Sequence, residues 1–358
     1  MKGLKNVFDQ RIWKIIVGRC DHRRSVHASC VGVVVMKILL INVDSRWNIA
    51  IRRMYNFYKK DHDVEMIDLG FSGYPHKRSK TIDASEYDKV FVSNIFDINK
   101  DRVTVEGCDD IVFGGIGSRN PHLQLPEEIE STDPFYFDDE DTSYGFITRG
   151  CIRKCWFCKV PKFEGDLKFY NTIEKIVKHD KVKFFDNNIL AYEKHCEVFQ
   201  WLIDRNIRCE FNQCLDFRLV NDENLKLLSQ LNYMGEYIFA FDEPKYEKLL
   251  EKKLKLMKKY ISKPWKLKFY IYYHPSMNIS ELIDRVEWCR ERECLPYVMR
   301  DAECWECENK NFLIDYTAYC NQPAMFKKKT FEEFLQIRHR KPERIEESVK
   351  IYRENGGR

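Results

Sequence analysis

The feature that most constrains the fold is an alternation of short apolar segments with longer segments of helical spacing, which continues along most of the chain. It begins at Lys37–Val43, an apolar run bounded by Asp44 and Ser45, and it still holds at Tyr297–Met299. Parallel strands need a crossover between them, and a helix usually provides it. The alternation therefore predicts an α/β fold built on parallel sheets.

Composition excludes several classes of protein. The 358 residues allow two domains, and 24 Phe, 19 Tyr and 7 Trp supply too many apolar anchors for a disordered chain. The net charge of +4 gives no indication of nucleic-acid binding. The longest apolar stretch, residues 31–43, contains Lys37 and Asn42 and is too short to cross a bilayer. We expect neither a nucleic-acid partner nor a membrane span.

Residues 1–35 form a basic N-terminal extension that differs from the rest of the chain. Its charged residues are Lys2, Lys5, Asp9, Arg11, Lys14, Arg19, Asp21, Arg23 and Arg24. One interpretation is an Arg-rich targeting segment, and the other is an extension outside the fold. We favour the second, because Met36 followed by a buried strand is typical of the start of a domain. We find no secretory signal and expect a cytoplasmic protein.

Residues 36–140 predict a doubly wound domain of the flavodoxin or Rossmann type. The predicted elements are strands at Lys37–Val43, Val64–Leu69, Val90–Ser93 and Ile111–Phe113 and a helix at Trp47–Lys60. Gly114, Gly115 and Gly117 follow the last strand. They either let the backbone approach a ligand or simply form a tight turn, and both interpretations stay open. Their spacing is not that of a dinucleotide-binding fingerprint.

Residues 141–303 predict six strand–helix units, a number that suits a partial parallel barrel. Strands are expected at Tyr144–Thr148, Val182–Phe185, Arg208–Phe211, Tyr237–Phe241, Leu267–Tyr273 and Tyr297–Met299. Helices are expected at Asn171–Lys178, Tyr192–Arg205, Asp222–Leu231, Pro244–Lys259 and Ile279–Glu293. Residues 304–358 predict a short helical segment with a break near Pro342, because proline cannot continue a helix.

Three cysteines directly after the first of these strands carry the chemistry. Cys151, Cys155 and Cys158 have C-x3-C-x2-C spacing. Thiolates are soft ligands that suit iron–sulfur clusters, and three of them on a four-iron cluster leave one iron open. Structural zinc would need a fourth ligand, which is not evident nearby, and three unrelated buried cysteines are the other alternative. The spacing favours the cluster.

The segment resembles the radical SAM superfamily, whose signature C-x3-C-x-aromatic-C is matched by Cys151, Cys155, Phe157 and Cys158. The flanking residues 148–150 and 160–165 resemble members with an N-terminal cobalamin-binding-like domain. The resemblance covers about residues 36–335. It implies a partial (β/α)6 radical SAM barrel that holds a [4Fe-4S] cluster on the three cysteines and binds S-adenosylmethionine at the open iron.

The resemblance also implies a reaction. An electron donor of the flavodoxin or ferredoxin type would reduce the cluster. S-adenosylmethionine would then be cleaved to methionine and a 5′-deoxyadenosyl radical that takes hydrogen from a substrate, which the sequence does not identify. The reaction subtype is open, and a methyltransferase is one candidate. The alternative function is a non-catalytic iron–sulfur or zinc protein that uses the cysteines structurally.

Polar residues recur where the predicted barrel strands end, the face that carries function in β/α barrels. They are Asp186, Asn187, Asn188, Asn212, Gln213, Asp216, Asp242 and Arg300. Any one of them could instead cap a helix or form a turn, and we expect Asp222 to be a cap. The resemblance implies that Asp186 and Asn187 bind the methionine amino group, and that Asn212 and Arg218 reach the ribose or the carboxylate.

Some features depart from the resemblance or lie outside it. Cobalamin-dependent relatives often carry D-x-H-x-x-G, but His62, His76 and His122 do not lie in that pattern. We therefore do not expect cobalamin, although binding without this ligand stays open. A second metal site at Cys304, Cys307 and Cys320, with Cys294 as a further candidate, is a less favoured alternative to unrelated thiols. A basic patch at Arg338, His339, Arg340, Lys341 and Arg344 is expected to be a solvated face.

Overall fold

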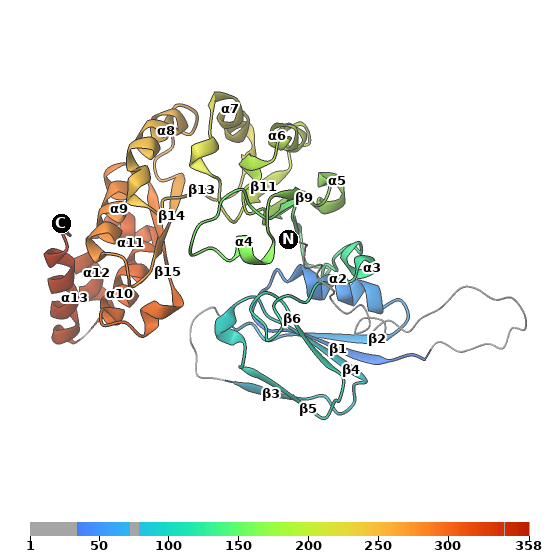
Figure 1. The fold of residues 1–358 in the computed structure, drawn as a ribbon. Coiled ribbons are helices and arrows are strands. Elements are labelled where there is room, and N and C mark those ends of the chain that lie inside the picture. The colour runs from blue at the N-terminus through green and yellow to red at the C-terminus, as the bar shows by residue number, and fades with distance from the viewer. Residues whose placement is uncertain (1–33, 72–78, 340, 358) are drawn as a thin grey trace, which may run out of the picture. The chain divides into compact units, whose positions relative to one another are not determined.

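A computed structural model describes residues 34–71, 79–339 and 341–357, which fall into two compact units divided between Glu140 and Asp141 (Figure 1). The predicted extension therefore lies almost entirely outside the described residues. Both units contain parallel sheets and helices, so the predicted α/β class is confirmed. None of the helices in the described part of the chain is long and apolar enough to cross a membrane.

The first unit is built on a four-stranded sheet in the order β2-β1-β4-β6, in which every neighbouring pair is parallel. Its strands are β1 (Lys37–Asn42), β2 (Asp63–Asp68), β4 (Lys89–Ser93) and β6 (Ile111–Gly114). β1 is a central strand and is buried on both faces, which explains its continuous apolar run.

The two faces of this sheet are covered differently. Helices α2 (Ile49–Tyr58) and α3 (Glu127–Glu130) pack on one face. A two-stranded parallel sheet, β3 (Lys80–Asp83) and β5 (Val103–Glu106), packs on the other, and η1 (Asp97–Asn99) precedes β5. This arrangement differs from the predicted doubly wound domain, which has helices on both faces. The reason is the short β-branched segments of β3 and β5, which suit strands better than helices.

The second unit contains six parallel strands that follow one another in chain order. β7 (Thr142–Gly145), β10 (Lys181–Phe184) and β11 (Arg208–Phe211) share one sheet with the short β12 (Asn232–Tyr233). β13 (Tyr237–Ala240), β14 (Leu267–Tyr273) and β15 (Leu295–Arg300) form another. A parallel bridge between Leu215 and Phe239 connects the two sheets, so the order is β7-β10-β11-β13-β14-β15.

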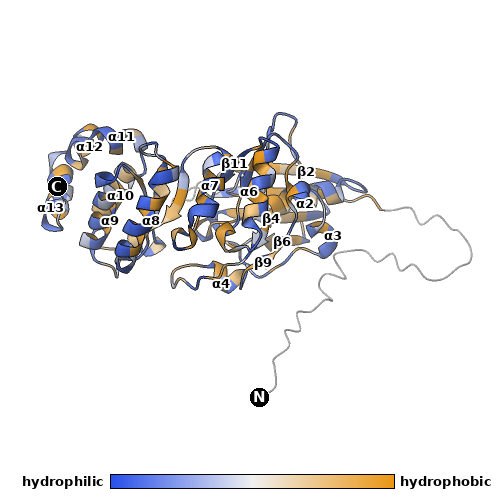
Figure 2. Cartoon of the chain, turned by 90° about the horizontal axis from the view of Figure 1, so that it is seen from above, coloured by the Kyte–Doolittle hydropathy of each residue, from blue (hydrophilic) through white to orange (hydrophobic). Residues whose placement is uncertain are grey.

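Helices cover the outer side of these strands and share one hydrophobic core with them (Figure 1). They are α5 (Ile173–Ile176), η2 (Ile189–Ala191), α6 (His195–Asp204), η3 (Phe217–Leu219), α7 (Asp222–Gln230), η4 (Pro244–Tyr246), α8 (Glu247–Tyr260) and α9 (Ile279–Glu291). Hydrophobic residues concentrate on the strands, whereas the helices carry hydrophilic residues on one side (Figure 2). This pattern is the one that buries a parallel sheet beneath amphipathic helices.

β11 and β14 begin and end where predicted, and the other predicted strands and the helices α6 to α9 occur with bounds shifted by one to three residues at one or both ends. Three predictions differ in more than their bounds. The first strand is interrupted, with β7 followed by β8 (Thr148–Arg149), which pairs antiparallel with β9 (Lys168–Phe169). The helix predicted at 171–178 is only the single turn α5. The cap of α7 is Asn221 rather than Asp222, because the Asn221 side chain accepts a hydrogen bond from the main-chain N–H of Asn224.

Helices α10 (Lys310–Cys320), α11 (Pro323–Lys328), α12 (Phe331–Arg338) and α13 (Pro342–Glu354) follow η5 (Ala302–Trp305). The predicted break is confirmed, since α13 begins at Pro342. The basic patch, of which Arg340 lies outside the described residues, is not simply a solvated face. Arg338, His339 and Arg344 each lie within 3.0 Å of the carboxylate of Asp315 on α10. Asp315 is fully buried, so it draws these side chains inward and ties α12 and α13 to α10.

Candidate functional site

The three cysteines lie in residues 150–165, here called the cysteine loop, which contains α4 (Val160–Phe163). Its ends are closed on each other, because the main-chain N–H of Cys151 donates to Gly165 O at 3.2 Å. Gly150 has φ of +79°, and a Cβ there would lie 2.2 Å from Asp166 O. Only glycine permits this approach, so the loop depends on it.

Glu164 holds the two ends of the cysteine loop from within. Its Oε2 accepts hydrogen bonds of 2.9 Å from Arg149 Nε, Gly150 N and Asn187 Nδ2. Burial raises the pKa of Glu164, but the charge of Arg149 and these hydrogen bonds outweigh it and hold the pKa below its usual value. Asn187 thus uses its amide N–H to support the loop, and its predicted role toward the methionine amino group stays a prediction.

Asp186 follows β10 and fixes the segment that leads into the cysteine loop. Its carboxylate accepts hydrogen bonds from Ile147 N at 3.1 Å, Thr148 N at 2.6 Å and Thr148 Oγ1 at 2.7 Å. The residue is 1% exposed, and burial raises its pKa to about 6 although these hydrogen bonds oppose the shift. This geometry makes Asp186 a positioning residue, and its predicted contact with a cofactor stays a prediction.

The thiols of Cys151, Cys155 and Cys158 are free, partly buried and close enough to influence one another. Burial is the main cause that raises the pKa of Cys155 and Cys158; the charge of Cys151 adds to both effects. Among the described residues, these sulfurs do not form a group whose members all lie within 4.8 Å of one another. The main-chain N–H of Arg153 donates to the Cys151 sulfur at 3.3 Å. The loop therefore brings the three thiols close enough for their charges to interact.

A buried carboxylate supports the loop from the ends of the strands. Asp216 accepts hydrogen bonds from Arg153 Nε at 2.7 Å, Arg218 Nε at 2.6 Å and Asn188 Nδ2 at 3.3 Å. Burial raises the pKa of Asp216, but the two guanidinium groups outweigh it and hold the pKa below its usual value. Two guanidinium groups therefore meet at Asp216 near Cys151, and the carboxylate of Asp242 also acts on Arg218.

Asn188 carries a buried acceptor atom that has no hydrogen-bond donor, close to Cys151. The residue is 2% exposed, its Nδ2 lies 4.0 Å from the Cys151 sulfur, and its Oδ1 has no hydrogen-bond partner. A buried acceptor without a donor costs free energy unless a ligand or water supplies one. Asn188 is therefore better placed than Asp186 or Asn187 to receive a donor from a bound molecule.

The far side of the cysteine loop docks on β14. The rings of Phe157 and Tyr272 stack with centroids 4.0 Å apart and an interplanar angle of 13°. Trp156 lies edge-on to Tyr272 and to His274 and is 62% exposed. The Tyr272 hydroxyl donates to Asp301 Oδ2 at 2.7 Å. The loop thus extends from the end of β7 to the ends of β14 and β15.

Two further residues, Asp242 and Cys214, lie near the thiols of the cysteine loop. Asp242 follows β13 and accepts a 3.0 Å hydrogen bond from Tyr272 N, and burial raises its pKa to about 6. Burial also raises the pKa of the Cys214 thiol, and the charges of Asp242, Asp216, Cys151 and Cys158 contribute to that shift. Cys214 and His274 were not predicted as site residues, although both follow strands, which was the signal that could have found them.

The remaining predicted binding residues are partly engaged with the protein itself. Asn212 follows β11, and its main-chain carbonyl accepts a 3.3 Å hydrogen bond from the Tyr270 hydroxyl. Arg218 lies in η3, where it is bound to Asp216 and lies over the Tyr246 ring at 5.1 Å from the centroid. The structure therefore brings Arg218 to the cysteine loop through Asp216 and Arg153, whereas Asn212 stays a candidate by position alone.

The glycines of the first unit serve close packing. Gly115 has φ of +91°, and a Cβ there would lie 2.3 Å from Asn94 O; a Cβ on Gly117 would lie 2.6 Å from Ile95 O. This geometry favours the tight-turn interpretation. The nearby carboxylate of Asp44 is occupied by Ile95 N, Phe96 N and Asn99 Nδ2. The expectation that the domain does not bind cobalamin stays a prediction, and His76 lies outside the described residues.

The structure separates the other predicted metal ligands. Cys304 lies in η5 and Cys307 lies just after it. Burial raises the pKa of Cys304, and the charge of Cys307 adds to this effect. Cys320 is instead buried at the end of α10, where its charge acts on Cys289. The described residues thus do not assemble Cys304, Cys307 and Cys320 into one set of ligands.

Comparison with known proteins adds no assignment. No family model matches the chain, and no curated protein matches it. The interpretation of the cysteine loop therefore depends on its spacing and surroundings.

Proposed function

We propose that this protein is a radical SAM enzyme, in which Cys151, Cys155 and Cys158 bind a [4Fe-4S] cluster at the carboxyl ends of a partial (β/α)6 barrel. The observation that carries the proposal is that the three thiols lie close enough to influence one another. They lie near Asn188 and Asp242, which follow the carboxyl ends of the parallel strands β10 and β13. In β/α barrels this is the end at which active sites are built.

The spacing of the thiols supports a cluster over a single zinc ion. Tetrahedral thiolates around one zinc ion would lie only about 3.8 Å apart, given ordinary zinc–sulfur bonds. Among the described residues, the three sulfurs do not all lie within 4.8 Å of one another, so they are not gathered as tightly as the ligands of one zinc ion. An N–H donor to the Cys151 sulfur further suits a cluster thiolate, because such hydrogen bonds tune the cluster.

The surrounding residues suit an amino acid group near the cluster. The Asn188 Oδ1 acceptor lacks a donor and can accept one from an ammonium group. The guanidinium groups of Arg153 and Arg218, which both bind Asp216, can also donate hydrogen bonds to a ligand carboxylate. When bound, the cluster and S-adenosylmethionine supply a 5′-deoxyadenosyl radical that removes hydrogen from an unreactive C–H bond.

Anaerobic reconstitution with iron and sulfide, followed by dithionite and S-adenosylmethionine, tests the proposal. We expect a four-iron chromophore and release of 5′-deoxyadenosine, both lost in Cys155→Ala. Cys108→Ala, which removes a partly buried thiol from the first unit, is the matched control and should behave as wild type. A colourless, zinc-loaded protein would contradict the proposal and favour the structural alternative. Formation of S-adenosylhomocysteine would indicate a methyltransferase, and a flavodoxin or ferredoxin should replace dithionite.

A further inference from the structure

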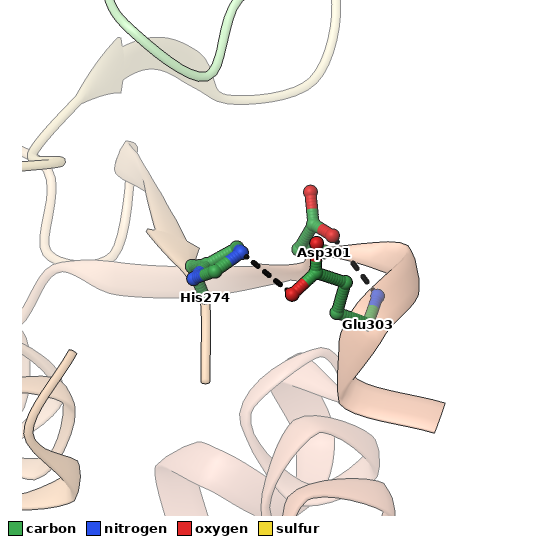
Figure 3. Close-up of side chains that lie close together, drawn as sticks. All are labelled: His274, Asp301 and Glu303. Carbon is green, nitrogen blue, oxygen red and sulfur yellow. Dashed lines mark hydrogen bonds and ion pairs between the residues drawn. The ribbon is translucent and has the colours of Figure 1, made fainter. Parts of the chain in front are cut away.

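A second group of ligand-type side chains lies at the ends of β14 and β15. One ligand atom from each of His274, Asp301 and Glu303 lies within 4.8 Å of the other two (Figure 3). It is the only such group of three or more His, Cys, Asp or Glu side chains among the described residues. It contains no thiol and is therefore chemically distinct from the cysteine loop.

The sheet register holds two of these residues side by side. Tyr273 on β14 pairs with Arg300 on β15, so His274 and Asp301 are the next residues beyond that pair. A ladder hydrogen bond of 2.8 Å from Asp301 N to Tyr273 O continues the pairing. Asp301 then caps η5 by accepting from Glu303 N at 2.9 Å, which brings Glu303 toward the other two. The arrangement is therefore formed by the main chain before any ligand binds.

Neighbouring groups orient the ligand atoms. His274 Nε2 lies 3.2 Å from Glu303 Oε2, while Nδ1 lies 2.8 Å from Ser276 Oγ. The main-chain N–H of Ser276 donates to Nδ1 at 3.1 Å, so the neutral ring carries its proton on Nε2, facing Glu303. A metal ion at Nε2 requires that proton to move to Nδ1, where Ser276 Oγ can accept it. The Tyr272 hydroxyl fixes Asp301 in the same way. Outer partners of this kind are typical of metal sites.

We propose that His274, Asp301 and Glu303 bind one first-row divalent metal ion of the Mn²⁺, Fe²⁺ or Zn²⁺ class. Two carboxylates balance the charge of such an ion, and the imidazole nitrogen disfavours Mg²⁺ and Ca²⁺, which prefer oxygen ligands alone. The positive charge of Lys159 acts on Asp301 and competes with a metal ion, but one ammonium group neutralises only one of the two carboxylates. The imidazole distinguishes the group from an ordinary cluster of surface acids.

The site faces solvent on the side of Glu303. The Glu303 side chain is 71% exposed, and three protein ligands leave coordination positions free toward solvent. Trp156 of the cysteine loop lies edge-on to His274. A substrate whose oxygen atom binds the ion would therefore be held beside that loop. This role as an anchor for an anionic or hydroxylated substrate rests on the proposed function, whereas the binding of the ion does not.

Titration of the metal-free full-length chain with Mn²⁺, followed by EPR, tests the site, because Mn²⁺ has little affinity for thiols. We expect one ion per chain and a loss of affinity of at least about tenfold in Glu303→Gln and in Asp301→Asn. Glu306→Gln removes an exposed carboxylate of the same segment and should leave binding unchanged. Persistence of the aqueous Mn²⁺ signal with excess protein, or binding by Glu303→Gln equal to wild type, would overturn the proposal.

Two features keep the Mn²⁺ titration independent of misfolding and of the proposed radical SAM activity. Glu303 is exposed, so its substitution should leave the fold intact even if Asp301→Asn unfolds the segment around η5. The titration uses neither iron nor S-adenosylmethionine. Failure to release 5′-deoxyadenosine therefore leaves the Mn²⁺ result standing, and failure to bind Mn²⁺ leaves the proposed cluster standing.

Discussion

The carboxyl ends of the strands carry polar residues in both units, but the two edges are used differently. In the first unit, Asp44 accepts three hydrogen bonds from residues 95–99, and Asn94 Nδ2 donates to Gly117 O at 2.7 Å. In the second unit, Asn188 Oδ1 lacks a partner, and Asn188 Nδ2 lies 4.0 Å from the free thiol of Cys151. The named groups of the first edge are paired within the protein, whereas Asn188 at the second edge keeps an unpaired buried acceptor.

The comparison teaches that polar residues after parallel strands do not by themselves mark a site. A buried polar group must be paired, and the pairing can come from the protein or from a ligand. The first unit pairs its groups internally because glycines at 115 and 117 let the main chain close over them. The second holds the ends of its cysteine loop in place through Glu164 and Asp186, which leaves the thiols between them free. Four substitutions test this difference.

The largest effect is expected from Gly150→Ala. The added Cβ would lie 2.2 Å from Asp166 O, so the cysteine loop cannot close and should fail to incorporate iron. Gly165→Ala is the matched control, because Gly165 also has positive φ, at +76°, but nothing lies within 4 Å of its Cβ position. We expect that control to cost about 1 kcal/mol and to retain iron. Iron and sulfide content per chain decide the matter, and equal content in both variants would contradict the account of the loop.

A smaller effect, confined to the other edge, is expected from Asp44→Ala. The substitution leaves Ile95 N, Phe96 N and Asn99 Nδ2 without their acceptor, which should destabilise the first unit by about 4 kcal/mol. Iron content and 5′-deoxyadenosine release should not change. Hydrogen exchange of residues 95–99 measures the effect. Loss of iron together with the loss of protection would show that the first edge also contributes to the site.

Sequence patterns predicted the strands well because apolar runs depend on local composition. The strands at Arg208–Phe211 and Leu267–Tyr273 occur with the predicted bounds. The three cysteines could also be named as candidate ligands from the sequence, since they lie close together in it. The His274, Asp301 and Glu303 group was not, because strand register brings His274 beside Asp301 across 27 residues.

The pH dependence of stability should distinguish the buried carboxylate of Asp186. Its pKa is raised from 3.8 to about 6 by burial, so the folded state binds the proton more tightly than the unfolded state. The free energy of unfolding should therefore fall as pH rises from about 4 to about 6, by about 3 kcal/mol in total. Asp186→Asn should lack this part of the pH dependence. Urea unfolding across that range measures it, and an identical pH slope in the variant would show that Asp186 does not titrate there.

The smallest effect is expected from Tyr272→Phe, which removes one hydroxyl and keeps the ring. The stack on Phe157 should persist, so the cysteine loop should still incorporate iron, at a cost in stability of about 1 kcal/mol. Asp301 loses its 2.7 Å hydrogen bond, however, and Mn²⁺ affinity should fall about tenfold. Tyr272→Ala, which also removes the stack, should lower iron content as well. If Tyr272→Phe reduced iron content as much as Tyr272→Ala, the hydroxyl rather than the ring would dock the loop, and the two ligand groups of this edge would be coupled.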